Sequence, residues 1–321
     1  KPDVRLMIMP VGPVVVFGAS NFPLAFSATG SDTASALAAG CPVIVKAHRS
    51  HPGTAEMVGR AIQKAAQSCS MPDGVFSLIQ GPGSKVGTAL VEHPQVKAVG
   101  FTGSRSGGRA LFNLAASRAE PIPVFAEMGS LNPVFALPRA LEERGSAFAE
   151  GLRGSVTLGV GQFCTNPGLV LGIESESLGS FIDTAESLFA EAPPATMLNP
   201  GIRDAYEFGL DALESDGNVA LVAKSTTAVD ATKTEAGAYV WATDVASFLA
   251  NPDLSHEVFG PSTLVVKCAS KADLIDVAQR LEGHLTATIH GTDDDLANYE
   301  DLVEVLERRV GRLIFNGFPT G

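Results

Sequence analysis

The sequence predicts an α/β protein made of two units, each with a mostly parallel β-sheet. Before residue 130, short apolar segments of strand type alternate repeatedly with helix-favouring segments, which is the pattern of a parallel sheet covered by helices. A second alternating series follows after residue 130. Hydrophobic residues make up 45% of the 321 residues and charged residues only 18%, so the composition is that of a globular chain long enough for two cores.

In the first half, strands are expected where apolar runs lead into turn residues, and helices where Ala-rich or amphipathic segments follow. The expected strands are 6–9, 14–17, 42–46, 75–80, a short strand from residue 98, and 123–126; the expected helices are 31–39, 53–68, one after residues 81–87 and one near Arg105. Ser31 or Asp32 is expected to cap the helix over 31–39, and Gly40 to end it.

The second half has the same alternation, apart from one long segment. The expected elements are helix 140–156, strand 169–173, helix 177–191, strand 263–268, helix 271–282, strand 285–290, helix 294–309 and strand 312–315. Pro, Gly and Asp interrupt residues 192–240, where 199–201 and 215–218 are interpreted as turns. Part of a substrate funnel is expected in this segment.

A cysteine lies in a glycine-rich segment, residues 158–168, directly before the apolar run 169–173. Glycines on both sides favour a tight loop whose backbone can approach a ligand closely. An exposed thiol among backbone N–H groups suits a nucleophile, because the thiolate attacks and the N–H groups hold the oxyanion that forms. Cys164 is therefore a candidate nucleophile, and a buried structural cysteine is the alternative.

Several further motifs surround this cysteine along the chain. They are residues 19–23 (Ala-Ser-Asn-Phe-Pro), 46–48 (Lys-Ala-His), 100–104 (Gly-Phe-Thr-Gly-Ser), 127–133 (Glu-Met-Gly-Ser-Leu-Asn-Pro) and 257–261 (Glu-Val-Phe-Gly-Pro). In this order they resemble the motif series of the NAD(P)-dependent aldehyde dehydrogenase superfamily. Residues 161–168 (Gly-Gln-Phe-Cys-Thr-Asn-Pro-Gly) resemble the branch of the α-ketoglutarate-semialdehyde (2,5-dioxovalerate) dehydrogenases and their NADP-dependent fatty-aldehyde relatives. The resemblance implies the aldehyde dehydrogenase fold, with a Rossmann-like parallel-sheet cofactor domain and an α/β catalytic domain.

The resemblance also implies oxidation of an aldehyde to a carboxylic acid through a cysteine thioester. In this reaction the Cys164 thiolate attacks the aldehyde, and the Asn21 amide shares the resulting oxyanion with the Cys164 backbone N–H. Glu127 would take a proton from the water that hydrolyses the thioester. From the residues alone, Asn21 would be interpreted as a turn asparagine, and Glu127 could be a surface charge or a cap. The branch implies α-ketoglutarate semialdehyde as the substrate.

The predicted cofactor is NADP, with NAD as the alternative. Lys46 ends an expected strand and is followed by His48 and Arg49. In dinucleotide folds an acidic residue at this place binds the ribose 2′-hydroxyl, whereas Arg accommodates a 2′-phosphate. NAD-preferring relatives tend to carry Glu where Arg49 stands. Without the resemblance, Lys46 would be interpreted as a solvated surface lysine.

Further cofactor contacts are expected at three places. Lys85 is expected to contact a phosphate, with a surface lysine as the alternative. Gly103 and Ser104 open a helix, where backbone N–H groups and the helix dipole bind anions. The resemblance implies that Glu257 hydrogen-bonds the nicotinamide ribose and that Phe259 packs against the nicotinamide ring. The sequence has no Gly-x-Gly-x-x-Gly fingerprint, and the family lacks it too.

Charge and composition exclude other classes of function. The net charge of −12 argues against nucleic-acid binding, and the six histidines show no metal-ligand spacing. No apolar run reaches the roughly 20 residues of a membrane span, and the first residues lack the apolar core of a signal peptide. Four cysteines without paired spacing suit a reducing cytoplasm, the expected location. Cys41, Cys69 and Cys268 stand in apolar or helical settings and are expected to fill cores.

The resemblance divides the chain into a cofactor-binding domain at 1–129 and a catalytic domain at 130–321. It also implies that the N-terminal part of the first domain and the C-terminal oligomerisation strand of the second are missing, and that the full-length protein is a homo-oligomer. Two alternatives remain. One is an acylating enzyme that passes the thioester to coenzyme A, although such relatives usually lack the base that Glu127 supplies. The other is a catalytically silent fragment.

Overall fold

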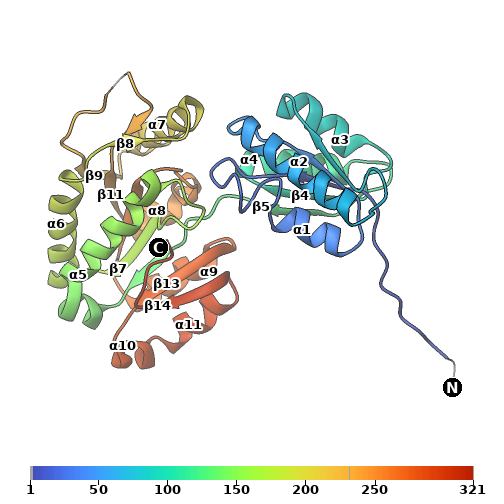
Figure 1. Ribbon diagram of the computed structural model, residues 1–321. Helices are drawn as coiled ribbons and strands as arrows, with labels where there is room; N and C mark the ends of the chain where they lie inside the picture. The colour runs from blue at the N-terminus through green and yellow to red at the C-terminus, as the bar shows by residue number, and fades with distance from the viewer. Residues whose placement is uncertain (1–2, 231, 321) are drawn as a thin grey trace. The chain divides into compact units, whose positions relative to one another are not determined.

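The computed structural model describes residues 3–230 and 232–320. The chain forms two compact units, Lys1–Gly129 and Ser130–Gly321 (Figure 1). Each unit has its own sheet and its own hydrophobic core, so each is described by itself.

The first unit holds a five-stranded sheet in the order β3-β2-β1-β4-β5, in which all neighbouring strands are parallel. The strands are β1 (Val14–Phe17), β2 (Val43–Lys46), β3 (Phe76–Ile79), β4 (Ala98–Thr102) and β5 (Val124–Glu127). The connections contain α1 (Ser31–Ala38), α2 (Pro52–Ser68), a π-helical turn (Gly83–Gly87), α3 (Thr88–Glu92) and α4 (Arg105–Ala116). This strand order is that of dinucleotide-binding folds, in which ligands bind at the carboxyl ends of the strands where the order reverses, between β1 and β4.

The apolar run of β1 is buried on both faces because helices cover both sides of the sheet. Val14 and Val16 pack in one cluster, and Val15 and Phe17 pack in the cluster on the opposite face. Strands that are buried on both faces carry continuous rather than alternating apolar residues. The prediction of a strand at 14–17 is confirmed.

The second unit holds a seven-stranded sheet in the order β14-β13-β6-β7-β12-β11-β9, parallel throughout except that β9 runs antiparallel to β11. The strands are β6 (Val134–Ala136), β7 (Leu169–Ile173), β9 (Ala220–Lys224), β11 (Tyr239–Asp244), β12 (Ser262–Cys268), β13 (His284–His290) and β14 (Val310–Phe315). A separate two-stranded ladder joins β8 (Ala195–Thr196) and β10 (Glu235–Ala236). The α-helices are α5 (Pro138–Thr157), α6 (Glu176–Ala190), α7 (Pro200–Ser215), α8 (Val245–Ala250), α9 (Lys271–Arg280), α10 (Asp293–Asn298) and α11 (Glu300–Glu307), and 3₁₀ turns occupy Leu158–Gly161 and Pro252–Ser255.

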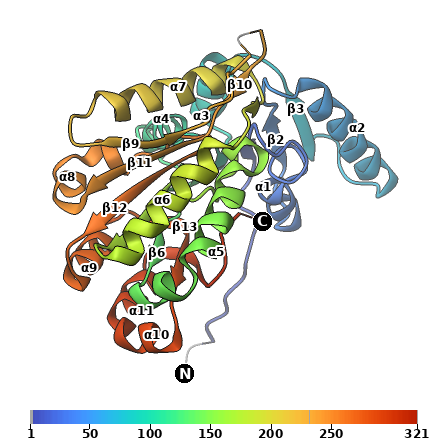
Figure 2. The same cartoon turned by 90° about the vertical axis from the view of Figure 1, so that its left-hand side faces the viewer.

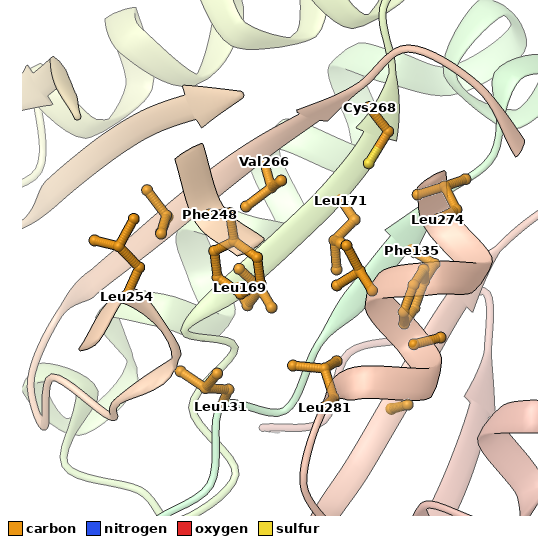
Figure 3. Close-up of a cluster of buried hydrophobic side chains, with 14 of the residues drawn as sticks. Leu131, Phe135, Leu169, Leu171, Phe248, Leu254, Val266, Cys268, Leu274 and Leu281 are labelled. Atoms are coloured by element: carbon orange, nitrogen blue, oxygen red, sulfur yellow. The ribbon is translucent and has the colours of Figure 1, made fainter. Parts of the chain in front are cut away.

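Side chains of the seven-stranded sheet alternate between two hydrophobic clusters. Leu169 and Leu171 point into one cluster together with Val266, as Figure 3 shows, whereas Val170 packs in the other. Helices α7, α8, α9 and α11 contribute to the first cluster, and α5 and α6 to the second. Helices α5 and α6 lie side by side (Figure 2). In the described part of the chain, no helix combines the length and apolarity that a bilayer crossing requires.

The expected strand at 6–9 is wrong. Leu6, Met7, Ile8 and Met9 are between 70% and 94% exposed and lie in no strand. Apolar β-type residues form a strand only when another strand supplies ladder partners for their N–H and C=O groups. Among the described residues this segment has no such ladder.

Two helix predictions also need correction. Gly30, not Ser31 or Asp32, is the N-cap of α1, and no side chain caps it; Gly40 follows the helix with φ of 79°, consistent with its predicted role as the terminator. The expected helix 294–309 is two helices, because Tyr299 leaves the helical conformation between α10 and α11.

The segment 192–240 contains a helix that the sequence analysis did not predict. The supposed turn at 199–201 is the start of α7: the Asn199 side chain accepts a hydrogen bond from the Ile202 N–H at 3.0 Å, and Pro200 occupies the first turn. Asn-Pro-Gly is therefore a capping sequence here, and the turn predicted at 215–218 ends the same helix.

Acid should destabilise the second unit between pH 6.5 and about 4, partly through His290. Burial against Phe148 and Phe318 lowers the pKa of His290 from 6.5 to about 4, and Arg144 acts in the same direction. Because this pKa is lowered on folding, its stabilising contribution is complete above pH 6.5 and is lost as the pH falls toward 4. The buried Trp241, the single tryptophan, reports unfolding of this unit.

We expect His290→Gln to make the loss of unfolding free energy between pH 7 and pH 5 smaller than in the wild type, measured by urea titration with Trp241 fluorescence. The exposed His256→Gln is the control and should keep the wild-type dependence. Equal dependence in all three proteins would contradict this assignment.

Candidate active site

The parallel sheet of the first unit brings four predicted site residues to one edge. Lys46 ends β2, Glu127 ends β5, Asn21 follows β1 and Ser104 follows β4. The register of the parallel strands aligns these ends. This edge contains the reversal between β1 and β4, where ligands bind in sheets of this order.

The loop that carries Asn21 is anchored on both sides. The Ala19 N–H donates to the Phe26 carbonyl at 2.7 Å, and the Ala19 carbonyl oxygen lies 2.9 Å from Nε2 of the buried His51. Asn21 itself is partly buried. His51, which the sequence analysis did not select, therefore links the start of α2 to the loop of Asn21.

The residues after β2 form a cluster of basic groups. Lys46 is only 7% exposed, and burial, followed by the charge of Arg49, lowers its pKa. Burial, followed by the charges of His51, Lys46 and Arg49, lowers the pKa of His48 to about 4. Lys46 is therefore not the solvated lysine of the alternative interpretation. Since burial and neighbouring charges disfavour the protonated forms of Lys46 and His48, a bound anion would favour these forms.

The remaining candidates of the first unit lie at strand ends or helix starts. The Gly103 N–H donates to the Glu127 carbonyl at 3.0 Å, which ties the ends of β4 and β5 together. Ser104 caps α4 by accepting a hydrogen bond from the Gly107 N–H at 3.3 Å. Lys85 is exposed on the π-helical turn that follows β3.

In the second unit, Cys164 is partly buried in an irregular loop between α5 and β7. Three successive residues before it, Gly159, Val160 and Gly161, have left-handed φ values of 54°, 59° and 65°. A β-branched residue rarely adopts this conformation, so Val160 is strained. The surrounding packing must hold the loop in this shape.

Gly161 of this loop contacts the backbone of the predicted motif 257–261. A Cβ atom at Gly161 would lie 2.2 Å from the carbonyl carbon of Gly260. The Asn166 side chain donates to the Gly260 carbonyl at 3.2 Å. The glycines were predicted to let the loop backbone approach a ligand closely. In the structure Gly161 approaches another part of the protein backbone, and this contact joins the cysteine loop to the motif 257–261.

The motif 257–261 is in turn supported by α7. A Cβ atom at Gly260 would lie 2.3 Å from the ring of Tyr206, and one at Gly209 would lie 2.9 Å from Val258. Glu257 and Phe259 are partly buried, and a carboxylate oxygen of Glu257 accepts from the Ser130 N–H at 3.4 Å. The second unit thus brings the Cys164 loop and the segment of Glu257 and Phe259 together.

The segment 192–240 also reaches the cysteine loop, since the Leu198 N–H donates to the Gln162 side chain at 2.9 Å. Its role as part of a substrate funnel stays a prediction. Asn132, which lies within the motif 127–133 but was not predicted to have a role, is fully buried and contacts this loop. Asn132 has a left-handed backbone, which asparagine tolerates better than most residues. Its hydrogen-bond partners in the loop are distant in sequence, so the sequence alone does not reveal them.

The other cysteines differ in their surroundings. Cys41 and Cys268 are buried, and burial raises the pKa of Cys268 to about 12, so its thiol stays protonated. The prediction that they fill cores is confirmed. For Cys69 it is wrong: this residue is the C-cap of α2 and is exposed, as are its neighbours at the end of the helix.

The fold and the motifs together define an α/β protein of the dinucleotide-binding type, joined to a second α/β unit with a glycine-flanked cysteine loop. The chain belongs to the aldehyde dehydrogenase family, because the sequence model of that family matches residues 3–321. Both the predicted family and the predicted fold class are confirmed.

Individual relatives agree with this placement. The chain is 53% identical over 321 residues to "Alpha-ketoglutaric semialdehyde dehydrogenase 2" of Azospirillum brasilense, covering 100% of this chain and 61% of the relative. It is 46% identical over 322 residues to "Alpha-ketoglutaric semialdehyde dehydrogenase" of Acinetobacter baylyi, covering 100% of this chain and 60% of that relative. The chain therefore spans about 60% of the length of these relatives.

The solved structure of betaine aldehyde dehydrogenase from Staphylococcus aureus in complex with NAD+ has the same fold. It superimposes with a TM-score of 0.80 at 20% identity, covering 96% of this chain and 60% of that one. At this identity the likeness concerns the fold alone.

We expect Gly161→Ala to destabilise the second unit, because a methyl group there meets the Gly260 backbone and the residue has a positive φ. The expected loss of unfolding free energy is about 1–3 kcal/mol or more. The control is Gly154→Ala on α5, where a Cβ meets nothing within 4 Å and helix propensity should add about 0.5–1 kcal/mol. Urea titrations of both variants test this, and a Gly161→Ala protein as stable as the Gly154→Ala protein would refute the close approach.

Proposed function

We propose that this chain carries out the NADP-preferring oxidation of an aldehyde to a carboxylic acid. The observation that carries the proposal is the location of Asn21, Lys46 and Glu127 at the carboxyl edge of a sheet with dinucleotide-binding strand order. The cysteine loop of the second unit supplies the nucleophile, and family membership supports the assignment. Because the chain spans about 60% of its named relatives, activity and substrate are proposals.

In the proposed reaction the Cys164 thiolate forms a bond to the aldehyde carbon and the carbonyl becomes an oxyanion. The Asn21 amide and the Cys164 backbone N–H are the proposed donors that stabilise this oxyanion, because N–H dipoles stabilise developing negative charge. The tetrahedral adduct then loses a hydride and becomes a Cys164 thioester. Glu127 takes a proton from water as the water oxygen attacks the thioester carbon. The carbon–sulfur bond breaks, and the acid and the Cys164 thiolate are released.

The nicotinamide cofactor, when bound, accepts the hydride. The residues that would hold its adenosine ribose and phosphate are Lys46, His48 and Arg49, with Lys85 as a further phosphate contact. The basic cluster fits a 2′-phosphate: burial, followed by the charges of neighbouring groups, lowers the pKa values of Lys46 and His48, and a bound dianion would favour their protonated forms. At the start of α4, Ser104 would contribute its backbone N–H, and Gly103, whose own N–H donates to the Glu127 carbonyl, would let a phosphate approach the backbone closely. Glu257 and Phe259 would contact the nicotinamide ribose and ring.

The proposed substrate is α-ketoglutarate semialdehyde. This assignment is supported by the names of the two relatives at 53% and 46% identity. The residues described above specify chemistry at an aldehyde carbon and do not by themselves select the remainder of the substrate.

Cys164→Ala should abolish NADPH formation from the aldehyde and leave the dissociation constant for NADP near the wild-type value. In the proposed reaction the thiol contacts the substrate and not the phosphates of the cofactor. The exposed Cys69→Ala is the matched control and should keep full activity. The absorbance of NADPH measures its formation, and titration of the protein's fluorescence with NADP measures the dissociation constant. Substantial turnover by Cys164→Ala would end the covalent mechanism.

Arg49→Glu should raise the Michaelis constant for NADP and leave that for NAD level or lower. A charge-assisted hydrogen bond to the 2′-phosphate contributes about 1.5–3 kcal/mol, which corresponds to roughly tenfold or more in the NADP/NAD preference. The control is Lys64→Glu, which makes the same change of charge at an exposed position of α2. If both variants keep the wild-type ratio of kcat/KM for the two cofactors, Arg49 has no role in cofactor choice.

A further inference from the structure

Three successive carbonyl groups of the cysteine loop accept hydrogen bonds from side chains that are distant in the sequence. The Asn132 Nδ2 group donates to the Cys164 carbonyl and to the Asn166 carbonyl, each at 2.9 Å. The Thr320 Oγ1 group donates to the Thr165 carbonyl at 2.7 Å. The backbone on the carboxyl side of Cys164 is therefore held residue by residue.

Asn132 uses both ends of its amide in this network. It is 0% exposed. Its Oδ1 atom accepts from the hydroxyl of Ser130 at 2.9 Å and from that of Thr286 at 3.0 Å. A flipped amide would direct its oxygen at the carbonyl oxygens of Cys164 and Asn166, so the hydrogen-bond network determines the orientation of the amide.

The network also connects the cysteine loop to the segment of Glu257. The Ser130 hydroxyl accepts from the Leu285 N–H at 3.1 Å, and the Ser130 N–H donates to Glu257. Ser130 also donates its hydroxyl proton to the Asn132 Oδ1 atom. Its side chain is thus one of the groups that fix the Asn132 amide.

Thr320, the second donor to the loop, is also anchored by hydrogen bonds. It is 6% exposed, and its carbonyl accepts from the hydroxyl of Ser155 on α5 at 3.1 Å. Its hydroxyl also lies 3.2 Å from that of Thr165. The loop is therefore held by a residue before β6 and by a residue after β14, each of which has further hydrogen-bond partners.

We infer that Asn132 is a positioning residue for the Cys164 nucleophile and that Thr320 assists it. The hydrogen bond to the Cys164 carbonyl fixes the peptide that follows the cysteine, and with it the direction of the Cys164 Cα–Cβ bond and backbone N–H. Attack requires the sulfur and the oxyanion donor in one geometry, and small displacements of reacting groups cost large factors in rate. This inference rests on the proposed function, in which Cys164 is the nucleophile.

The test compares Asn132→Ala with Thr286→Val in the otherwise intact protein. Asn132→Ala removes the donors to the loop, whereas Thr286→Val removes one hydroxyl from the opposite side of the same amide and leaves the loop donors in place. A purely structural role predicts that both changes act only through stability. Unfolding free energy, the rate of Cys164 alkylation by iodoacetamide from pH 6 to 10, and kcat and KM are measured for each.

Asn132→Ala should lower the alkylation rate of Cys164 at the alkaline plateau, and kcat, by about tenfold or more. The KM for NADP should stay level, and Thr286→Val should keep the wild-type alkylation rate. The exposed Cys69 thiol is an internal reference that should react equally in all variants. Equal alkylation of Cys164 in Asn132→Ala and in Thr286→Val would overturn the inference.

If Asn132→Ala does not fold, Thr320→Val decides the question, because it removes the donor to the Thr165 carbonyl at an analogous place. It should lower the Cys164 plateau rate by several-fold, and an unchanged rate would overturn the inference.

Failure of the proposed function would be seen in different measurements: the wild-type protein would form no NADPH from aldehydes, or Cys164→Ala would stay active. A selective decrease in Cys164 alkylation in Asn132→Ala would still support the positioning of that thiol.

Discussion

The cysteine loop has to satisfy its buried backbone groups without a helix or a sheet. Between the 3₁₀ turn that ends at Gly161 and the start of β7 at Leu169, the chain has no regular element. Buried carbonyl groups that lack partners cost free energy comparable to a lost hydrogen bond. The side chains of Asn132 and Thr320 donate to the carbonyl groups of residues 164–166, and the Gly168 N–H donates to the Asn166 carbonyl as well. This requirement explains why a polar, fully buried asparagine stands two residues before β6.

The same loop combines strain with tight packing. Val160 has a left-handed backbone, and Gly161 lies against the backbone of Gly260, so neither conformation would persist in an isolated segment. The parallel sheet beside the loop and helix α7 behind Gly260 maintain these conformations. A thiol held on such a loop has a defined direction, which is the property that attack on an aldehyde needs.

Much of the fold could be predicted from the sequence, because continuous apolar runs such as 14–17 and 169–173 specify buried strands by themselves. Leu6–Met9 is also a continuous apolar run but is not a strand, since strand formation depends on a partner strand that composition does not reveal. Helix α7 was missed because Asn199 and Pro200 were interpreted as a turn although they cap a helix. The candidate residues at strand ends followed from motif order. The role of Asn132 could not be predicted, because its partners are residues 164, 166 and 286, which only the tertiary structure brings near.

The central claim is that Cys164 becomes acylated and that Glu127 is needed to release the acid. The most direct measurement is peptide mass spectrometry of Glu127→Gln protein after mixing with α-ketoglutarate semialdehyde and NADP. Loss of the base should leave the thioester in place, so the peptide with Cys164 should gain the mass of the aldehyde less two hydrogen atoms. The same adduct should be absent without NADP. Formation of NADPH with no adduct on Cys164, or an adduct on Cys69 instead, would contradict the account.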